Sequence, residues 1–138
     1  MRRVLRRGGR VAVNVPGPTP PLFSIMEAAL TTYLGSETAA FVRQVFSLHE
    51  PAAITRLLDS AGLDDVELRR YTRRLSLPTP EEFLWQYLHS TPLVAAVAQL
   101  DDATRAALTR DVASGWQPMT VDGELVLELP IVLAAGRA

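Results

Sequence analysis

The stretch that decides the fold is Gly8-Gly9-Arg10-Val11-Ala12-Val13-Asn14-Val15-Pro16. Two glycines end a short Arg-rich segment, and a nearly all-apolar run follows them. A strand with one wet face alternates apolar and polar residues, and this run barely does. The pattern therefore predicts a strand covered on both faces, as in the middle of a helix-flanked parallel sheet. The few residues before it offer no neighbouring strand, so we expect something else to supply one.

Composition favours an ordinary globular protein. The 138 residues are 48% hydrophobic and carry a net charge of −1, which predicts a single domain over 1–138. No apolar run approaches the roughly 20 residues that span a bilayer, and none of signal-peptide length follows the N-terminal arginines. We therefore expect a cytoplasmic protein that does not enter membranes.

Several kinds of site are excluded or disfavoured. The chain has no cysteine, which excludes disulfides, thiolate nucleophiles and Cys-based zinc sites. His49 and His89 are the only histidines, so we expect no metal site. The near-neutral charge argues against nucleic acid as the main partner.

Periodicity and turn signals predict an α/β protein. The expected helices cover 22–34, 37–46, 51–61, 80–90, 92–100 and 102–114. The expected strands lie near 10–15, 65–75 and 124–135. Thr79 and Glu82 form a capping box, and Asp122-Gly123 is a hairpin turn signal. Together these elements predict a small mixed sheet of about three main strands plus a C-terminal hairpin, flanked by helices.

The order of these elements resembles the class I S-adenosylmethionine-dependent methyltransferases. The segment from Leu5 to Val13 resembles the family's L-x-P-G-G-x signature before its fifth strand, with Arg7 in place of the usual proline. Phe46-Ser47-Leu48, and then the residues from Leu57 to Val66, resemble the join between its last helix and sixth strand. Thr79-Pro80-Glu81-Glu82-Phe83 and the C-terminal hairpin look like small-molecule methyltransferases of the ubiquinone/menaquinone-biosynthesis type. The resemblance implies a partial Rossmann-like fold over essentially the whole chain.

The resemblance also implies what the chain lacks. The family binds S-adenosylmethionine with a glycine-rich E/D-x-G-x-G-x-G loop after its first strand, and no such loop exists in this sequence. The chain thus resembles the acceptor-binding C-terminal half of such an enzyme. We expect that this chain alone neither binds the cofactor nor transfers a methyl group. We expect S-adenosylmethionine to bind only if a partner half completes the enzyme.

Candidate site residues lie on two predicted helices and before a third. A set of aromatic, Met and His side chains either lines an apolar acceptor pocket or packs as ordinary core: Phe23, Met26, Tyr33, Trp85, Tyr87 and His89. His49 is a candidate general base near a substrate hydroxyl, or else a capping or surface residue at a helix entrance.

The run Arg69-Arg70-Tyr71-Thr72-Arg73-Arg74 interleaves arginine with an aromatic residue, as nucleic-acid-binding segments do. On a strand its charges fall on both faces, and a solvated edge strand explains this more simply. In the resembled family the corresponding sixth strand is the sheet edge, and the last strand runs antiparallel between the fifth and the sixth.

That arrangement leaves the strand at 10–15 as an open apolar edge, with Val11, Val13 and Val15 as the expected dimer edge. Three hypotheses remain open. The chain is an acceptor-binding half that pairs with itself or with a separately encoded cofactor half. Alternatively, it is a non-catalytic homodimer that binds a small apolar ligand or acts in interactions. The third is that it is a truncated piece of a longer enzyme.

Overall fold

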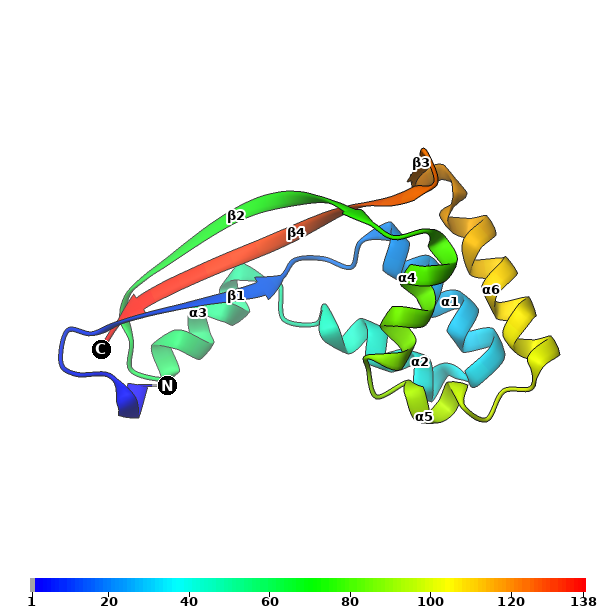
Figure 1. The fold of residues 1–138 in the computed structure, drawn as a ribbon. Coiled ribbons are helices and arrows are strands. Elements are labelled where there is room, and N and C mark those ends of the chain that lie inside the picture. The colour runs from blue at the N-terminus through cyan, green and yellow to red at the C-terminus, as the bar shows by residue number, and fades with distance from the viewer. Residues whose placement is uncertain (1) are drawn as a thin grey trace. The chain divides into compact units, whose positions relative to one another are not determined.

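A computed structural model describes residues 2–138 (Figure 1). In chain order the elements are η1 (Arg2–Val4), β1 (Arg10–Pro16), α1 (Pro21–Leu34), α2 (Ser36–Val45), α3 (Pro51–Ser60), β2 (Asp64–Leu77), α4 (Pro80–His89), α5 (Val94–Val97), α6 (Asp102–Trp116), η2 (Gln117–Met119), β3 (Thr120–Val121) and β4 (Glu124–Arg137). The class is α/β, as predicted. No helix among the described residues is long and apolar enough to cross a membrane.

The chain forms two compact units, which we describe separately. The sheet unit consists of Met1–Pro18, Val45–Arg73 and Leu129–Ala138. The helical unit consists of Thr19–Gln44 and Arg74–Glu128. The single domain expected from chain length stays a prediction.

The sheet has the strand order β1-β4-β2, and β3 forms a hairpin with β4. In the β1–β4 ladder Arg10 lies opposite Arg137 and Pro16 lies opposite Ile131. β4 is antiparallel to its neighbours, so the sheet is antiparallel throughout and the expected mixed sheet is wrong. The predicted hairpin turn is confirmed, with Asp122 and Gly123 at φ values of 51° and 86°.

β1 is an end strand with one covered face, so the predicted cover on both faces is wrong. Arg10, Ala12 and Asn14 are exposed, whereas the intervening valines are half-buried. The physical reason is the position of the strand in the sheet. Among the described residues, β1 pairs with β4 alone, and α3 is the α-helix of the sheet unit that packs on the sheet.

α3 builds the core of the sheet unit against one sheet face. Ile54, Leu58 and Leu63 pack with Val132 and Ala134 of β4. Half-buried apolar side chains of the outer strands surround this cluster: Val11, Val13, Val15, Val66 and Leu68. The helix begins at Pro51 and is followed by Gly62 at φ 74°, as the sequence predicts.

The helical unit is centred on the contact between α1 and α6. Trp116 is fully buried, and its Nε1–H donates a hydrogen bond to the Leu22 carbonyl oxygen at 2.8 Å. A Cβ at Gly115 would lie 2.5 Å from Ile25 Cγ2, so the glycine permits the close approach of the two helices. The predicted capping box of α4 is confirmed by reciprocal bonds between Thr79 and Glu82.

Other expected elements differ in length. The short Arg-rich segment before Gly8 contains the three-residue η1, and Met1 lies outside the described residues. The helix expected at 92–100 is the four-residue α5. Pro130 lies one residue beyond the last β1–β4 pair.

Candidate functional site

A cleft of about 370 Å³ opens in the sheet unit where β1 ends and α3 begins. Gly17 and Pro18 follow β1 and form one wall, and His49 and Glu50 precede α3 and form another. The remaining lining comes from neighbouring strands: Arg70, Tyr71 and Thr72 of β2, and Pro130, Ile131 and Val132 of β4. The cleft combines an apolar floor with several ionisable groups, which is typical of small-molecule sites.

His49, the predicted general base, lies in this cleft with a defined tautomer. Its Nδ1 is 2.7 Å from the carbonyl oxygen of Phe46. A carbonyl oxygen only accepts, so Nδ1 carries the proton and donates, which leaves Nε2 as the atom that gains or loses a proton. Nε2 lies 3.3 Å from Glu50 Oε1, and the imidazole is 30% exposed. This geometry permits proton transfer through Nε2, and the role as a base stays a prediction.

Two of the proposed acceptor-binding residues meet in the helical unit. The rings of Phe23 (α1) and Tyr87 (α4) lie 5.4 Å apart between centroids. Phe83 completes the group at 6.4 Å from Phe23 and 6.3 Å from Tyr87. We call these three rings the aromatic cluster. Phe83 was not singled out in the sequence, although its position four residues before Tyr87 places both rings on one helix face.

The Tyr87 hydroxyl is buried and has no hydrogen-bond partner among the described residues. Burial raises the pKa of Tyr87, so the hydroxyl stays protonated at neutral pH and keeps a proton to donate. A buried polar group without a partner is costly, which makes this hydroxyl the polar feature of an otherwise apolar cluster.

The other four candidate residues lie elsewhere. Met26 is fully buried core. Tyr33 lies at the surface and its hydroxyl donates to Asp111 Oδ2 at 2.6 Å, a hydrogen bond that raises the pKa of Tyr33. The rings of Trp85 and His89 lie against each other at a tilt of 34°, with centroids 5.6 Å apart. The structure therefore does not bring the six predicted residues into one pocket.

Trp85 belongs to a shallow hollow of about 310 Å³ between α4 and α6. Its Nε1–H donates to Thr109 Oγ1, and the Arg105 guanidinium lies 5.0 Å from its ring centroid. Arg105 Nη2 also donates to the Val97 carbonyl oxygen, whereas its Nε has no partner among the described residues. These contacts account for Trp85 as a packing residue.

An apolar groove of about 330 Å³ adjoins the end strand β1. Every lining side chain is apolar: Val13, Val15, Leu48, Ile54, Leu57, Leu58, Ala61 and Leu63. Leu57 and Leu48 are 54% and 37% exposed. Of the expected dimer edge, Val13 and Val15 line this groove and Val11 packs with the α3 cluster, so the open edge itself is the β1 backbone.

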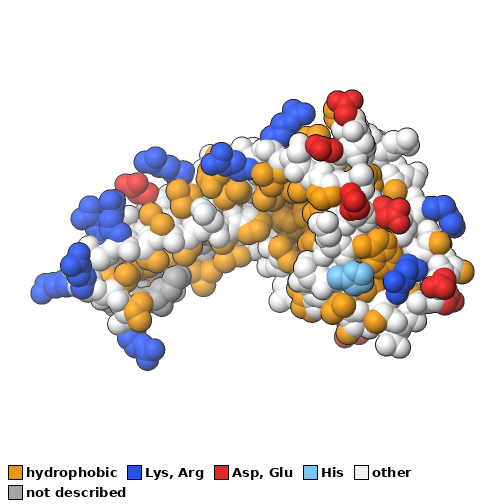
Figure 2. Space-filling model, viewed as in Figure 1, with side chains coloured by type: hydrophobic (Ala, Val, Ile, Leu, Met, Phe, Trp, Pro, Cys, Tyr) orange, Lys and Arg blue, Asp and Glu red, His pale blue; other side chains and the backbone are white. Residues whose placement is uncertain are grey.

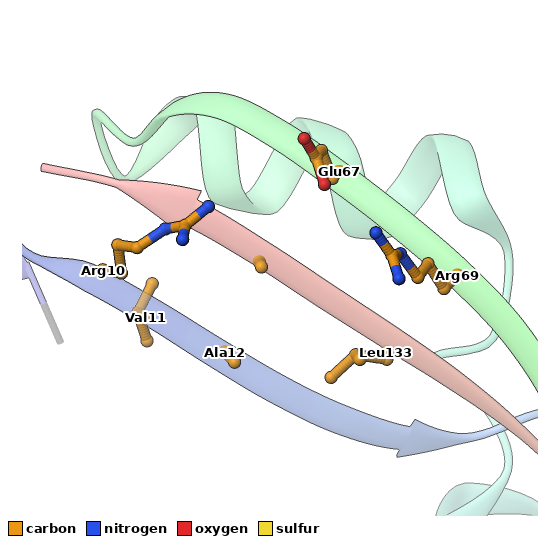
Figure 3. Close-up of a pocket in the computed structure, with 7 residues that line it drawn as sticks. Arg10, Val11, Ala12, Glu67, Arg69 and Leu133 are labelled. Carbon is orange, nitrogen blue, oxygen red and sulfur yellow. The ribbon is translucent and has the colours of Figure 1, made fainter.

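The sheet face opposite α3 carries a further hollow of about 340 Å³ (Figure 3). Ala12, Leu133 and Ala135 form its apolar floor, and Arg10, Glu67 and Arg69 stand around it. Figure 2 shows basic side chains with apolar patches between them over the sheet unit, whereas acidic side chains gather on the helical unit.

The predicted edge position of the arginine-rich strand is confirmed, because β2 lies at the other end of the strand order. Its side chains are exposed from Arg69 to Ser76. The Arg73 guanidinium lies 5.5 Å from the centroid of Tyr71, two residues away on the same face. The contact between Arg73 and Tyr71 is therefore made within β2 itself.

No group of three or more His, Asp or Glu side chains among residues 2–138 is arranged to hold a metal ion. No family model matches the sequence, and a search of curated proteins finds no significant match.

Proposed function

We propose that the chain is a methyltransferase-like protein that corresponds to the acceptor-binding half of a class I S-adenosylmethionine-dependent methyltransferase. The observation that carries this proposal is the strand order. β4 lies antiparallel between β1 and β2, and β1 and β2 run in the same direction. The sequence resemblance implies this arrangement for the last three strands of the family, with β1 as the fifth strand.

Open surfaces of the sheet unit also support the proposal. The β1 backbone edge, the apolar groove beside α3 and the hollow on the opposite face all leave apolar groups exposed. A half that adds a strand next to β1 and helices on both sheet faces would cover all of them.

We expect that the chain's own residues do not hold S-adenosylmethionine, because the sequence has no glycine-rich E/D-x-G-x-G-x-G loop. The glycine pair closes a turn, since Gly8 N–H donates to the Ala138 carbonyl oxygen and Gly9 N–H donates to that of Arg6. These two N–H groups are therefore used within the chain. The proposed role of this chain is to hold the methyl acceptor, and the aromatic cluster supplies apolar contact while Tyr87 donates a hydrogen bond to a polar acceptor atom.

Calorimetry with S-adenosylmethionine tests the missing cofactor site. We expect no saturable heat from the pure chain, because the sequence has no glycine-rich E/D-x-G-x-G-x-G loop. Micromolar binding by the chain alone would contradict the assignment of the cofactor site to another polypeptide segment.

A second test asks where the cofactor half is encoded. We expect an in-frame glycine-rich E/D-x-G-x-G-x-G segment upstream of the Met1 codon, or a separate gene product that carries one and binds this chain. If neither exists, the non-catalytic alternative replaces the proposal.

That alternative is a homodimer that binds a small ligand without catalysis, and the sequence of β1 favours it. If two copies of β1 pair antiparallel about Val13, Val11 lies opposite Val15 and Ala12 opposite Asn14, with no like charges facing each other. Such pairing would extend the sheet across both copies.

Replacing Leu57 with Asp tests whether the groove beside β1 takes part in association. Leu57 is 54% exposed, so the fold should tolerate the change, while a charge in an apolar interface is costly. We expect light scattering to show association by the unaltered protein and monomers for Leu57→Asp. Val121→Asp is the control, because Val121 is 52% exposed on the β3 hairpin. Monomers at high concentration in the unaltered protein would count against self-association.

A further inference from the structure

The cleft beside His49 contains an arginine whose side chain has no partner. Arg70 lines the cleft, and its guanidinium makes no hydrogen bond or ion pair within the described part of the chain. The neighbouring arginines of β2 are also exposed. What distinguishes Arg70 from them is its position in the lining of the cleft.

Strand geometry aims Arg70 into the cleft. Val66 and Leu68 pack against the α3 cluster, and alternate residues of a strand share a face. Arg70 and Thr72 therefore continue the face that α3 covers. α3 begins at Pro51, and the part of the sheet face beyond that end of the helix is not covered by it. The cleft opens there, over the side chains of Arg70 and Thr72.

The floor of the cleft is apolar and rigid. Pro130 and Val132 supply it from β4, and Pro18 and Pro51 stand at its sides. The loop after β1 is fixed on Pro130, whose carbonyl oxygen accepts a hydrogen bond of 2.7 Å from Gly17 N–H. The proline rings form an apolar surface on which a flat ring can pack. The volume of about 370 Å³ falls within the range of small-molecule sites.

The charges in the cleft select an anion. Nε2 of His49 lies 3.3 Å from Glu50 Oε1, so the Glu50 carboxylate already has a neighbour on its own side of the cleft. Glu50 is thus occupied by His49, and Arg70 is the cation that the cleft presents to a ligand. The fork of a guanidinium matches a carboxylate with two parallel hydrogen bonds.

We propose that this cleft binds a small aromatic carboxylate, with its carboxylate on Arg70 and its ring against Pro130 and Pro51. The site belongs to the sheet unit alone. It does not depend on the proposed function, because binding requires neither a cofactor nor a partner half.

Titration of the full chain with sodium benzoate, followed by calorimetry and by NMR chemical shifts, tests the proposal. We expect saturable binding, and we expect Arg70→Gln to weaken it about tenfold or more, since hydrogen bonds to charged groups are the stronger class. Arg69→Gln is the matched control. It removes the same charge from the adjacent residue, whose side chain lines the hollow on the opposite sheet face. We expect it to bind benzoate as the unaltered chain does.

Benzyl alcohol has the same ring without the charge, and we expect it to bind at least about tenfold more weakly than benzoate. Absence of benzoate binding by the unaltered chain would overturn the proposal. So would equal losses in the Arg69→Gln and Arg70→Gln proteins, because they would show attraction to a basic surface and no defined site. Neither result bears on the cofactor tests of the proposed function.

Discussion

Trp116→Ala is expected to lower the free energy of unfolding of the helical unit by about 3–5 kcal/mol, the usual loss for a large aromatic residue removed from a core. Trp116 has no exposed surface, and its ring lies 5.7 Å from that of Phe83. The change leaves a cavity where α6 meets α1 and also removes the hydrogen bond to the Leu22 carbonyl oxygen. Urea denaturation followed by circular dichroism measures the loss.

Two further variants separate the causes of that loss. Trp116→Phe keeps most of the packing and removes the hydrogen bond, so we expect a smaller loss of about 1 kcal/mol from that bond. Trp85→Ala is the control, since Trp85 is the only other tryptophan and is only half-buried. A Trp85→Ala protein as unstable as Trp116→Ala would contradict the central place of Trp116 in this unit.

Gly17→Ala is expected to destabilise the sheet unit by about 1–3 kcal/mol through overpacking. A Cβ at position 17 would lie 2.6 Å from Pro130 Cβ and 3.1 Å from the Pro130 carbonyl oxygen. Backbone atoms and a rigid proline ring cannot move aside cheaply, so the loop after β1 must shift and lose its hydrogen bond to Pro130. Chemical denaturation of the variant measures the cost.

A double-mutant cycle with Pro130→Gly tests the stated cause. Removal of the Pro130 ring makes room for the new methyl group, so the two substitutions should couple favourably by about 0.5–3 kcal/mol. Strictly additive losses would show that the contact with Pro130 is not what excludes a side chain at Gly17.

Local features of the fold could be predicted from the sequence because their causes are local. The capping box of Thr79 and Glu82 and the turn at Asp122-Gly123 depend on residues within a few positions of each other. The central, antiparallel position of β4 did not come from such signals. It was expected only from the resemblance to a known family, because strand order depends on contacts between distant segments.

The error at β1 has the same origin. Ala12 and the flanking valines read as a strand buried on both faces, yet Ala12 is exposed. Whether an alanine faces a helix or solvent is decided by what packs on the sheet, and neither Ala12 nor its neighbours determine that.

The candidate site could be predicted only in part, because it too depends on contacts between distant segments. Helical spacing distinguishes the face of Phe83 and Tyr87 from the face of Trp85 and His89, but it does not show which face meets Phe23. Likewise, Arg70 is one of several arginines in the sequence of β2. Only the position of the α3 start relative to the strand places it in a cleft.

The strand order has a consequence for synthesis on the ribosome. The middle strand of the sheet unit comes from Leu129–Ala138, and it joins β1 to β2, both of which precede it in the sequence. The β1 edge that faces β4 therefore has no partner until Leu129–Ala138 has been translated. The segments of the helical unit, which end at Glu128, are complete before that. Pairing of such distant segments is intrinsically slow, so β1 and β2 stay without their common partner β4 during much of translation.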